Sequence, residues 1–146
     1  MEESLSYLEE QFQLPELNVK QYSPLTLAYI GDAIYDLVIR TVLVRQGNMQ
    51  VNKLHKHASS LVKAEKQSEM IRTLEPQLTE EELHIYKRGR NAKSNTMAKN
   101  ASVGDYRRAT GFEAVIGYLY LKGEYSRMID LIKAGLAPEK EQVGNE

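Results

Sequence analysis

The sequence predicts an all-α fold in a single compact domain of 146 residues. Leu, Ala, Glu and Lys are plentiful, and these residues favour helices. Apolar residues recur at helical spacing in several segments, and no segment has the alternating pattern typical of a strand. The chain is long enough to bury a core without covalent links. It contains no cysteine, which excludes disulfide bonds, Cys-ligated zinc and a thiol nucleophile.

Local start and stop signals predict the helices in the first half of the chain. A short leading helix is expected to end near Pro15. Ser23 is a good N-cap, and Pro24 suits the first position of a helix that runs to about Arg45. Residues 51–74 read as one or two further helices.

Similar signals predict the second half. Thr79 and Glu82 form a capping box that opens a short helix through Lys87, with Gly89 expected to end it. Residues 91–101 have no apolar stripe and many turn-forming residues, which indicates a loop. A helix is expected over 102–121 and a last one over 124–133.

The charge of the chain is unevenly distributed, although its net value is only −1. The N-terminal residues are acidic, whereas the segment 87–108 is strongly basic. A basic surface can bind a polyanion even when the whole protein is neutral, and a solvated loop with ordinary surface lysines is the alternative. The basic residues of this segment are Lys87, Arg88, Arg90, Lys93, Lys99, Arg107 and Arg108.

Two acids stand in apolar helical segments. Asp32 lies within residues 27–39 and Glu113 within 106–120, and the residues one turn from each acid are mostly small or apolar. A solvated helix face would carry Lys and Glu at such positions. An ionised carboxylate in an apolar place costs several kcal/mol unless it is compensated.

Small neighbouring residues would allow the two helices to approach closely, so that Asp32 and Glu113 face each other. Two facing carboxylates repel each other and raise each other's pKa. A divalent cation removes this penalty, and hard oxygen ligands suit Mg²⁺ or Mn²⁺. The alternative is that each acid pairs with an arginine or caps a neighbouring helix.

Two motifs around these acids resemble those of the ribonuclease III family. Residues 28–34, Ala-Tyr-Ile-Gly-Asp-Ala-Ile, are similar to its Glu-Phe-Leu-Gly-Asp-Ala-Val type signature. Residues 110–121, which begin Thr-Gly-Phe-Glu-Ala, are similar to its second motif. The segment 87–94 and the expected lack of a double-stranded-RNA-binding domain resemble the Mini-ribonuclease III branch. The resemblance covers 22–135 as the catalytic domain, leaving an N-terminal extension (1–21) and a tail expected to be disordered (136–146).

The resemblance implies that Asp32 and Glu113 are catalytic and metal-binding residues. Ala28 and Thr110 stand where the family has a Glu and an Asp, so half of the usual carboxylate set is absent. One metal held by two carboxylates and waters remains chemically adequate. Asp36 and Asp105 are candidates for acids that support the site from outside; for Asp105 a first-turn helix acid is the alternative.

The resemblance also implies a function: metal-dependent hydrolysis of phosphodiester bonds in double-stranded RNA, in the maturation of large-subunit (23S) ribosomal RNA. It implies a homodimer and a ribosomal protein as helper. Asn91 and Ser94, with the basic residues of 87–108, are expected to contact the RNA. The acidic N-terminus and the absence of a long apolar run predict a cytoplasmic location. Two alternatives are a non-catalytic helical RNA- or ribosome-binding module and an all-α metal-dependent nucleotide pyrophosphatase.

Overall fold

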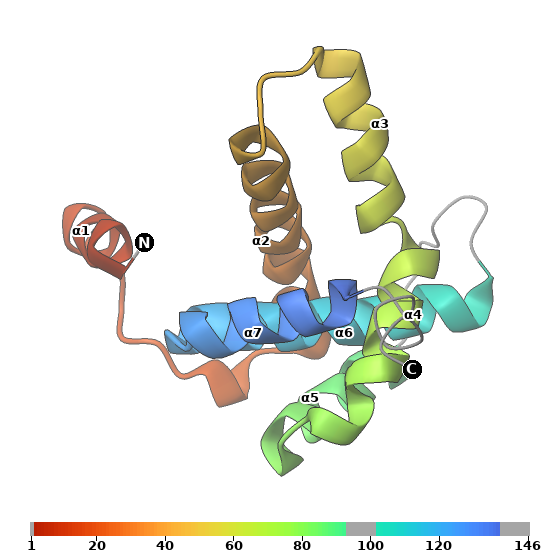
Figure 1. Cartoon of the computed structure of the whole chain (residues 1–146). Helices are drawn as coiled ribbons and strands as arrows, with labels where there is room; N and C mark the ends of the chain where they lie inside the picture. Colours follow the sequence, from red (N-terminus) through yellow and green to blue (C-terminus); the bar gives the residue numbers. More distant parts are fainter. Residues whose placement is uncertain (1, 93–101, 138–146) are drawn as a thin grey trace.

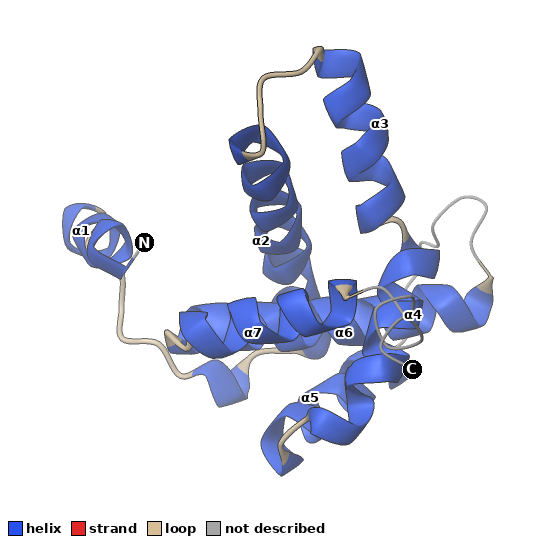
Figure 2. Ribbon diagram, in the orientation of Figure 1, coloured by secondary structure: helices blue, strands red, loops and turns tan. Residues whose placement is uncertain are grey.

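The computed structural model describes residues 2–92 and 102–137, and every regular element in these ranges is helical (Figure 2). The all-α prediction is therefore confirmed. None of the described helices is both long and apolar enough to cross a membrane. The helices are α1 (Glu2–Gln11), α2 (Pro24–Arg45), α3 (Val51–Val62), α4 (Ala64–Leu74), α5 (Glu80–Asn91), α6 (Val103–Lys122) and α7 (Tyr125–Leu136), with 3₁₀ turns at Val19–Gln21 and Glu75–Gln77.

The helix starts follow the capping signals of the sequence. The Ser23 hydroxyl accepts a hydrogen bond from the Thr26 backbone N–H at 3.2 Å, and Pro24 follows as the first helical residue. At the start of α5, Thr79 and Glu82 satisfy each other's backbone N–H groups, which is the expected capping box. Residues 51–74 form two helices, which meet at Lys63 in an extended conformation.

The prediction that Gly89 ends its helix was wrong. α5 continues through Gly89 to Asn91, because this glycine lies in the contact between α5 and α6. A Cβ at Gly89 would come within 2.9 Å of the Gly111 Cα, so the missing side chain allows close packing rather than a turn. The expected loop and tail fall on 93–101 and 138–146, outside the described residues.

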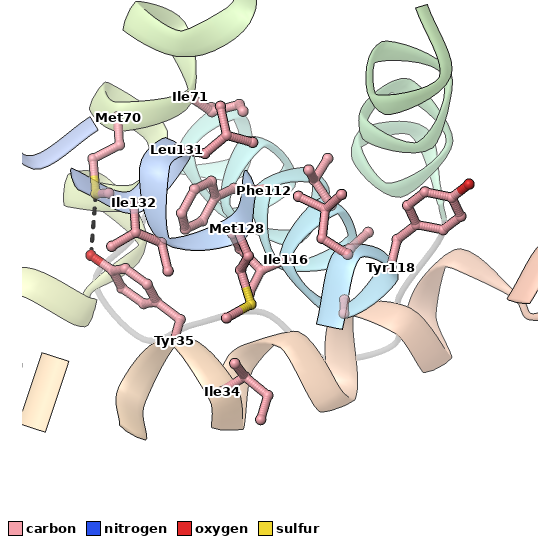
Figure 3. Packing of buried hydrophobic residues seen from close by; sticks show 14 of the residues in the cluster. Ile34, Tyr35, Met70, Ile71, Phe112, Ile116, Tyr118, Met128, Leu131 and Ile132 are labelled. Carbon is pink, nitrogen blue, oxygen red and sulfur yellow. Dashed lines mark hydrogen bonds between the residues drawn. The ribbon is translucent and has the colours of Figure 1, made fainter. Parts of the chain in front are cut away.

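The core is built around α6, against which α2, α4, α5 and α7 pack (Figure 1). Phe112 and Ile116 of α6 are buried among side chains of α2, α4 and α7 (Figure 3). The Tyr35 ring meets the Phe112 ring edge-on at 5.3 Å. The Tyr35 hydroxyl donates to the Leu61 carbonyl at 2.8 Å, which joins the end of α3 to the core.

Two glycines bring the backbones of α2 and α6 into contact. A Cβ at Gly31 would overlap the carbonyl group of Glu113, and a Cβ at Gly117 would overlap the carbonyl group of Leu27. Each helix thus presents a glycine to the backbone of the other. No other residue fits at either position without moving a helix. This contact decides where the functional side chains of the two helices lie.

Candidate active site

Asp32 and Glu113 come together because of the α2–α6 contact. Asp32 directly follows Gly31, and the backbone against which Gly31 packs is that of Glu113. The two carboxyl groups interact through both charge and a hydrogen bond. The two acids therefore lie close together across α2 and α6. Neither acid has an arginine partner among the described ion pairs.

The two acids differ in their exposure. Glu113 is half-buried, whereas Asp32 is exposed on the surface of α2. Burial, followed by the charge of Asp32 and the hydrogen bond to it, raises the pKa of Glu113 to about 9, and a hydrogen bond from Gln67 acts in the opposite direction. Asp32 is exposed although most residues one turn from it are small or apolar, because Tyr29, one of these neighbours, is exposed as well. The pair as a whole favours a bound cation.

The other sequence candidates lie in different surroundings. Asp36 is paired with Arg40 at 3.0 Å. Asp105 lies in the first turn of α6, where its carboxylate is paired with Arg108 at 3.2 Å. Within the described ranges, no group of three or more His, Asp or Glu side chains is arranged to hold a metal. A metal at Asp32 and Glu113 would therefore have two carboxylate ligands from this part of the chain.

The positions where the family resemblance would place further acids are buried. Ala28 is 6 % exposed and Thr110 is 8 % exposed. The Thr110 hydroxyl donates to the Tyr106 carbonyl at 3.0 Å, one turn earlier in α6. Thr110 is therefore satisfied within its own helix.

Sequence reasoning missed Gln67, whose side chain contacts Glu113. Gln67 lies on α4 and is only 2 % exposed. Its position three residues before Met70 and four before Ile71 places it on the apolar face of that helix, as the hydrophobic spacing already indicates. An amide on an apolar helix face was the signal that could have found it.

Some side chains of the basic segment are exposed, and others contact neighbouring residues. Lys87 and Arg107 are exposed, whereas Arg88 is half-buried. The Arg90 guanidinium lies 5.5 Å from the centre of the Tyr86 ring, and its Nε donates to the exposed Asn91 at 3.3 Å. Arg108 Nε donates to Ser68 at 2.7 Å, in addition to the ion pair with Asp105. Lys93, Ser94 and Lys99 lie outside the described residues.

The raised pKa of Glu113 predicts a stability that falls with pH in metal-free protein. Near pH 4 the carboxyl is mostly neutral in both states and costs little. Between the ordinary value of 4.5 and about 9, the unfolded chain releases the proton while the folded chain keeps it, so the free energy of unfolding decreases as pH rises. Each pKa unit corresponds to about 1.4 kcal/mol.

Glu113→Gln should therefore raise the melting temperature of metal-free protein at pH 8 by roughly 5 °C or more. The gain should shrink toward zero at pH 4. Thermal unfolding followed by circular dichroism in a chelator, at pH 4, 6 and 8, checks this. A gain independent of pH would contradict the assignment of the buried charge to Glu113.

The comparisons with known proteins show the family of the chain. The family model described as the ribonuclease III domain matches residues 25–124, which include both acids. A Mini-ribonuclease 3 from Clostridium tetani is 50 % identical and covers 96 % of this chain and 92 % of its own length. One from Thermoanaerobacter sp. is 48 % identical over 91 % of this chain and 94 % of its own.

A solved structure supports the same grouping. The crystal structure of a protein from Fusobacterium nucleatum superposes with a TM-score of 0.74 at 33 % sequence identity, covering 81 % of this chain and 94 % of that protein. The two motifs, the helical fold that joins them and these relatives all agree. The chain therefore belongs to the Mini-ribonuclease 3 branch of the ribonuclease III family and is an endoribonuclease.

Proposed function

We propose that the protein is a metal-dependent endoribonuclease that hydrolyses phosphodiester bonds of double-stranded RNA, with Asp32 and Glu113 as the catalytic residues and metal ligands. The observation that carries the proposal is the closeness of the two carboxyl groups, because burial and the charge of Asp32 make the ionised form of Glu113 unfavourable without a cation. The endoribonuclease family to which the chain belongs excludes both rival interpretations, the non-catalytic module and the nucleotide pyrophosphatase.

The donor set fits Mg²⁺, with Mn²⁺ as an alternative ion. Mg²⁺ usually keeps several waters and is held by one or two carboxylates, which matches the pair Asp32 and Glu113. When bound, the ion lowers the pKa of water and acts as a Lewis acid toward the phosphate. Glu113 provides a half-buried carboxylate, and the exposed Asp32 provides the second carboxylate at the surface, where a large substrate can reach it.

The basic segment 87–108 supports RNA as the substrate. Duplex RNA is recognised through phosphates, 2′-hydroxyls and shape, because its major groove is closed to side chains. Exposed Lys87 and Arg107 are suited to phosphate contacts, and Asn91 to a 2′-hydroxyl. The family resemblance supports precursor ribosomal RNA of the large subunit as the substrate and a ribosomal protein as helper. The cytoplasmic location stays a prediction.

The direct test is incubation of the protein with a long RNA duplex, with Mg²⁺ and with a chelator. Internal cleavage in Mg²⁺ and none with the chelator is the expected result. The same assay on single-stranded RNA of the same sequence should give much slower cleavage. Unchanged duplex cleavage in the chelator would contradict the metal requirement.

Alanine at Arg88, Arg90 and Lys93 together should weaken duplex binding roughly 10-fold or more, whatever the RNA sequence. The slope of log affinity against log salt should flatten by up to about one unit per lost phosphate contact. Turnover at saturating RNA should fall less than affinity. Filter binding at several salt concentrations measures both. Alanine at the exposed Lys20, Arg45 and Lys133 is the matched control; equal effects of the two triple variants would contradict the proposed RNA-binding segment.

The exposed face of α2 supports a homodimer. Apolar side chains recur along it at Leu25, Tyr29, Leu37 and Val44, which are 37 %, 81 %, 49 % and 59 % exposed. A stripe of this kind on one helix is typical of an interface. Two copies related by a two-fold axis would match the symmetry of a duplex.

Leu37→Lys should therefore reduce the mass measured by light scattering from twice 16.7 kDa to a single chain. In a two-fold interface each copy contributes one substituted residue, so two charges are buried in the apolar contact. Ile129→Lys on α7, where Ile129 is 43 % exposed, is the control and should leave the mass unchanged. A monomeric mass for the active wild-type protein would contradict the dimer.

A further inference from the structure

Gln67 is a buried polar side chain beside Glu113. It lies on the face of α4 that carries Met70 and Ile71, and it is 2 % exposed. A buried amide is unfavourable unless its donors and acceptors are satisfied. An apolar residue of similar size would pack at this position without that cost, so the amide calls for an explanation.

The hydrogen bonds of Gln67 point toward the site. Its Nε2 donates to the carbonyl of Val62, at the end of α3, at 2.6 Å. The same side chain lies close enough to the carboxyl group of Glu113 to favour its ionised form and so to lower its pKa. Its Oε1 is buried and has no hydrogen-bond partner among the described residues. An amide has two N–H donors, so one N–H remains for Glu113 beside the one that Val62 accepts.

We propose that Gln67 is a positioning residue: its buried amide, fixed by the Val62 carbonyl, holds the Glu113 carboxyl group toward Asp32, and its free Oε1 accepts a hydrogen bond from a donor that joins the site. This inference rests on the proposed function, since it assigns Gln67 to the support of a metal ligand. Groups that orient ligating carboxylates in this way are a regular part of metal sites.

The backbone geometry makes this support effective. Gly31 fixes the main chain of Glu113 against α2, and Gln67 approaches its side chain from α4. Glu113 is thus held from two different helices. A carboxylate fixed at both ends loses little rotational freedom when a cation binds, which favours binding.

The competing explanation is that Gln67 only ties α3 to α4. Tyr35 offers a matched control, because its hydroxyl donates to the Leu61 carbonyl at 2.8 Å, one residue before Val62. Tyr35→Phe removes a buried hydrogen bond to the same end of α3 without removing a contact of Glu113. Gln67→Met keeps the side-chain length and removes the amide.

The first measurement is titration of the metal-free protein with Mn²⁺ alone, by calorimetry. Gln67→Met should weaken Mn²⁺ binding roughly 10- to 100-fold, and Tyr35→Phe should change it less than twofold. In duplex cleavage, Gln67→Met should lower kcat with little change in KM. Wild-type Mn²⁺ affinity in Gln67→Met, or an equal loss in Tyr35→Phe, would overturn the positioning role.

The second measurement needs no metal. In a chelator, the melting temperatures of Gln67→Met, Glu113→Met and the double variant should deviate from additivity by about 2 °C or more, because the two side chains touch. Tyr35→Phe combined with Glu113→Met should be additive. Additive behaviour of the Gln67 and Glu113 changes would overturn the inference.

The two measurements separate the inference from the proposed function. If the wild-type protein binds no Mn²⁺ while the Gln67–Glu113 changes are non-additive, the contact is real and the proposed metal site fails. In that case Gln67 cannot position a metal ligand, and the inference fails together with the proposed metal site. If Mn²⁺ binds to the wild type and the variants are additive, the proposed function stands and Gln67 has only a structural role.

Discussion

Asp32→Asn or Glu113→Gln should reduce the cleavage of duplex RNA by at least about 1000-fold. Each amide keeps the shape of the side chain and loses the charge that holds the cation. The stabilisation that a metal gives to the reacting phosphate amounts to several kcal/mol, and each 1.36 kcal/mol is about a tenfold change in rate. Single-turnover cleavage with saturating enzyme in Mg²⁺ measures the effect without the contribution of RNA binding.

The controls separate chemistry from folding. Both variants should keep the helical circular dichroism of the wild type, and their affinity for duplex should change little, because the basic residues are intact. Asp130→Asn, a change of an exposed acid on α7, should leave the rate unchanged. A near-wild-type rate in Mg²⁺ for either carboxylate variant would remove that residue from the site.

Gly31→Ala and Gly117→Ala should each destabilise the protein strongly, by roughly 3 kcal/mol or more. The added Cβ would overlap a carbonyl group on the facing helix, and backbone atoms cannot move aside as a side chain can. Any relief requires α2 and α6 to separate, which moves Asp32 relative to Glu113. Cleavage should therefore fall even in the fraction of protein that remains folded.

Gly104→Ala is the matched control, since its nearest neighbour is the guanidinium of Arg108 at 3.1 Å, the flexible end of a side chain. In the first turn of α6, alanine at this position should be neutral or slightly stabilising. Urea unfolding of the three variants measures the difference. Equal stability of Gly31→Ala and Gly104→Ala would mean that α2 and α6 do not touch at Gly31.

Much of the fold could be predicted from local signals. Ser23, Pro24 and the Thr79–Glu82 capping box identify helix starts because a cap is satisfied by residues within one turn. Gly89 was misread because glycine serves both as a helix terminator and as a point of close contact. Only the facing Gly111 of α6, distant in the sequence, decides between these roles.

The site could be predicted in part, because some of its residues carry a local signal in the sequence. Asp32 and Glu113 are distinguished by their apolar surroundings and by the motifs that contain them. The exposure of Asp32 could not be predicted, because it depends on which face of α2 meets α6. Gln67 was missed because its role depends on the tertiary contact of α4 with Glu113.

The most direct test of the account is the location of Mn²⁺ by anomalous scattering in crystals soaked with the ion. The expected result is a peak within about 2.0–2.3 Å of carboxylate oxygens of both Asp32 and Glu113, with waters as the remaining ligands. Well-ordered carboxyl groups of Asp32 and Glu113 that remain in contact with each other, with Mn²⁺ absent or bound elsewhere on the chain, would contradict the proposed metal site.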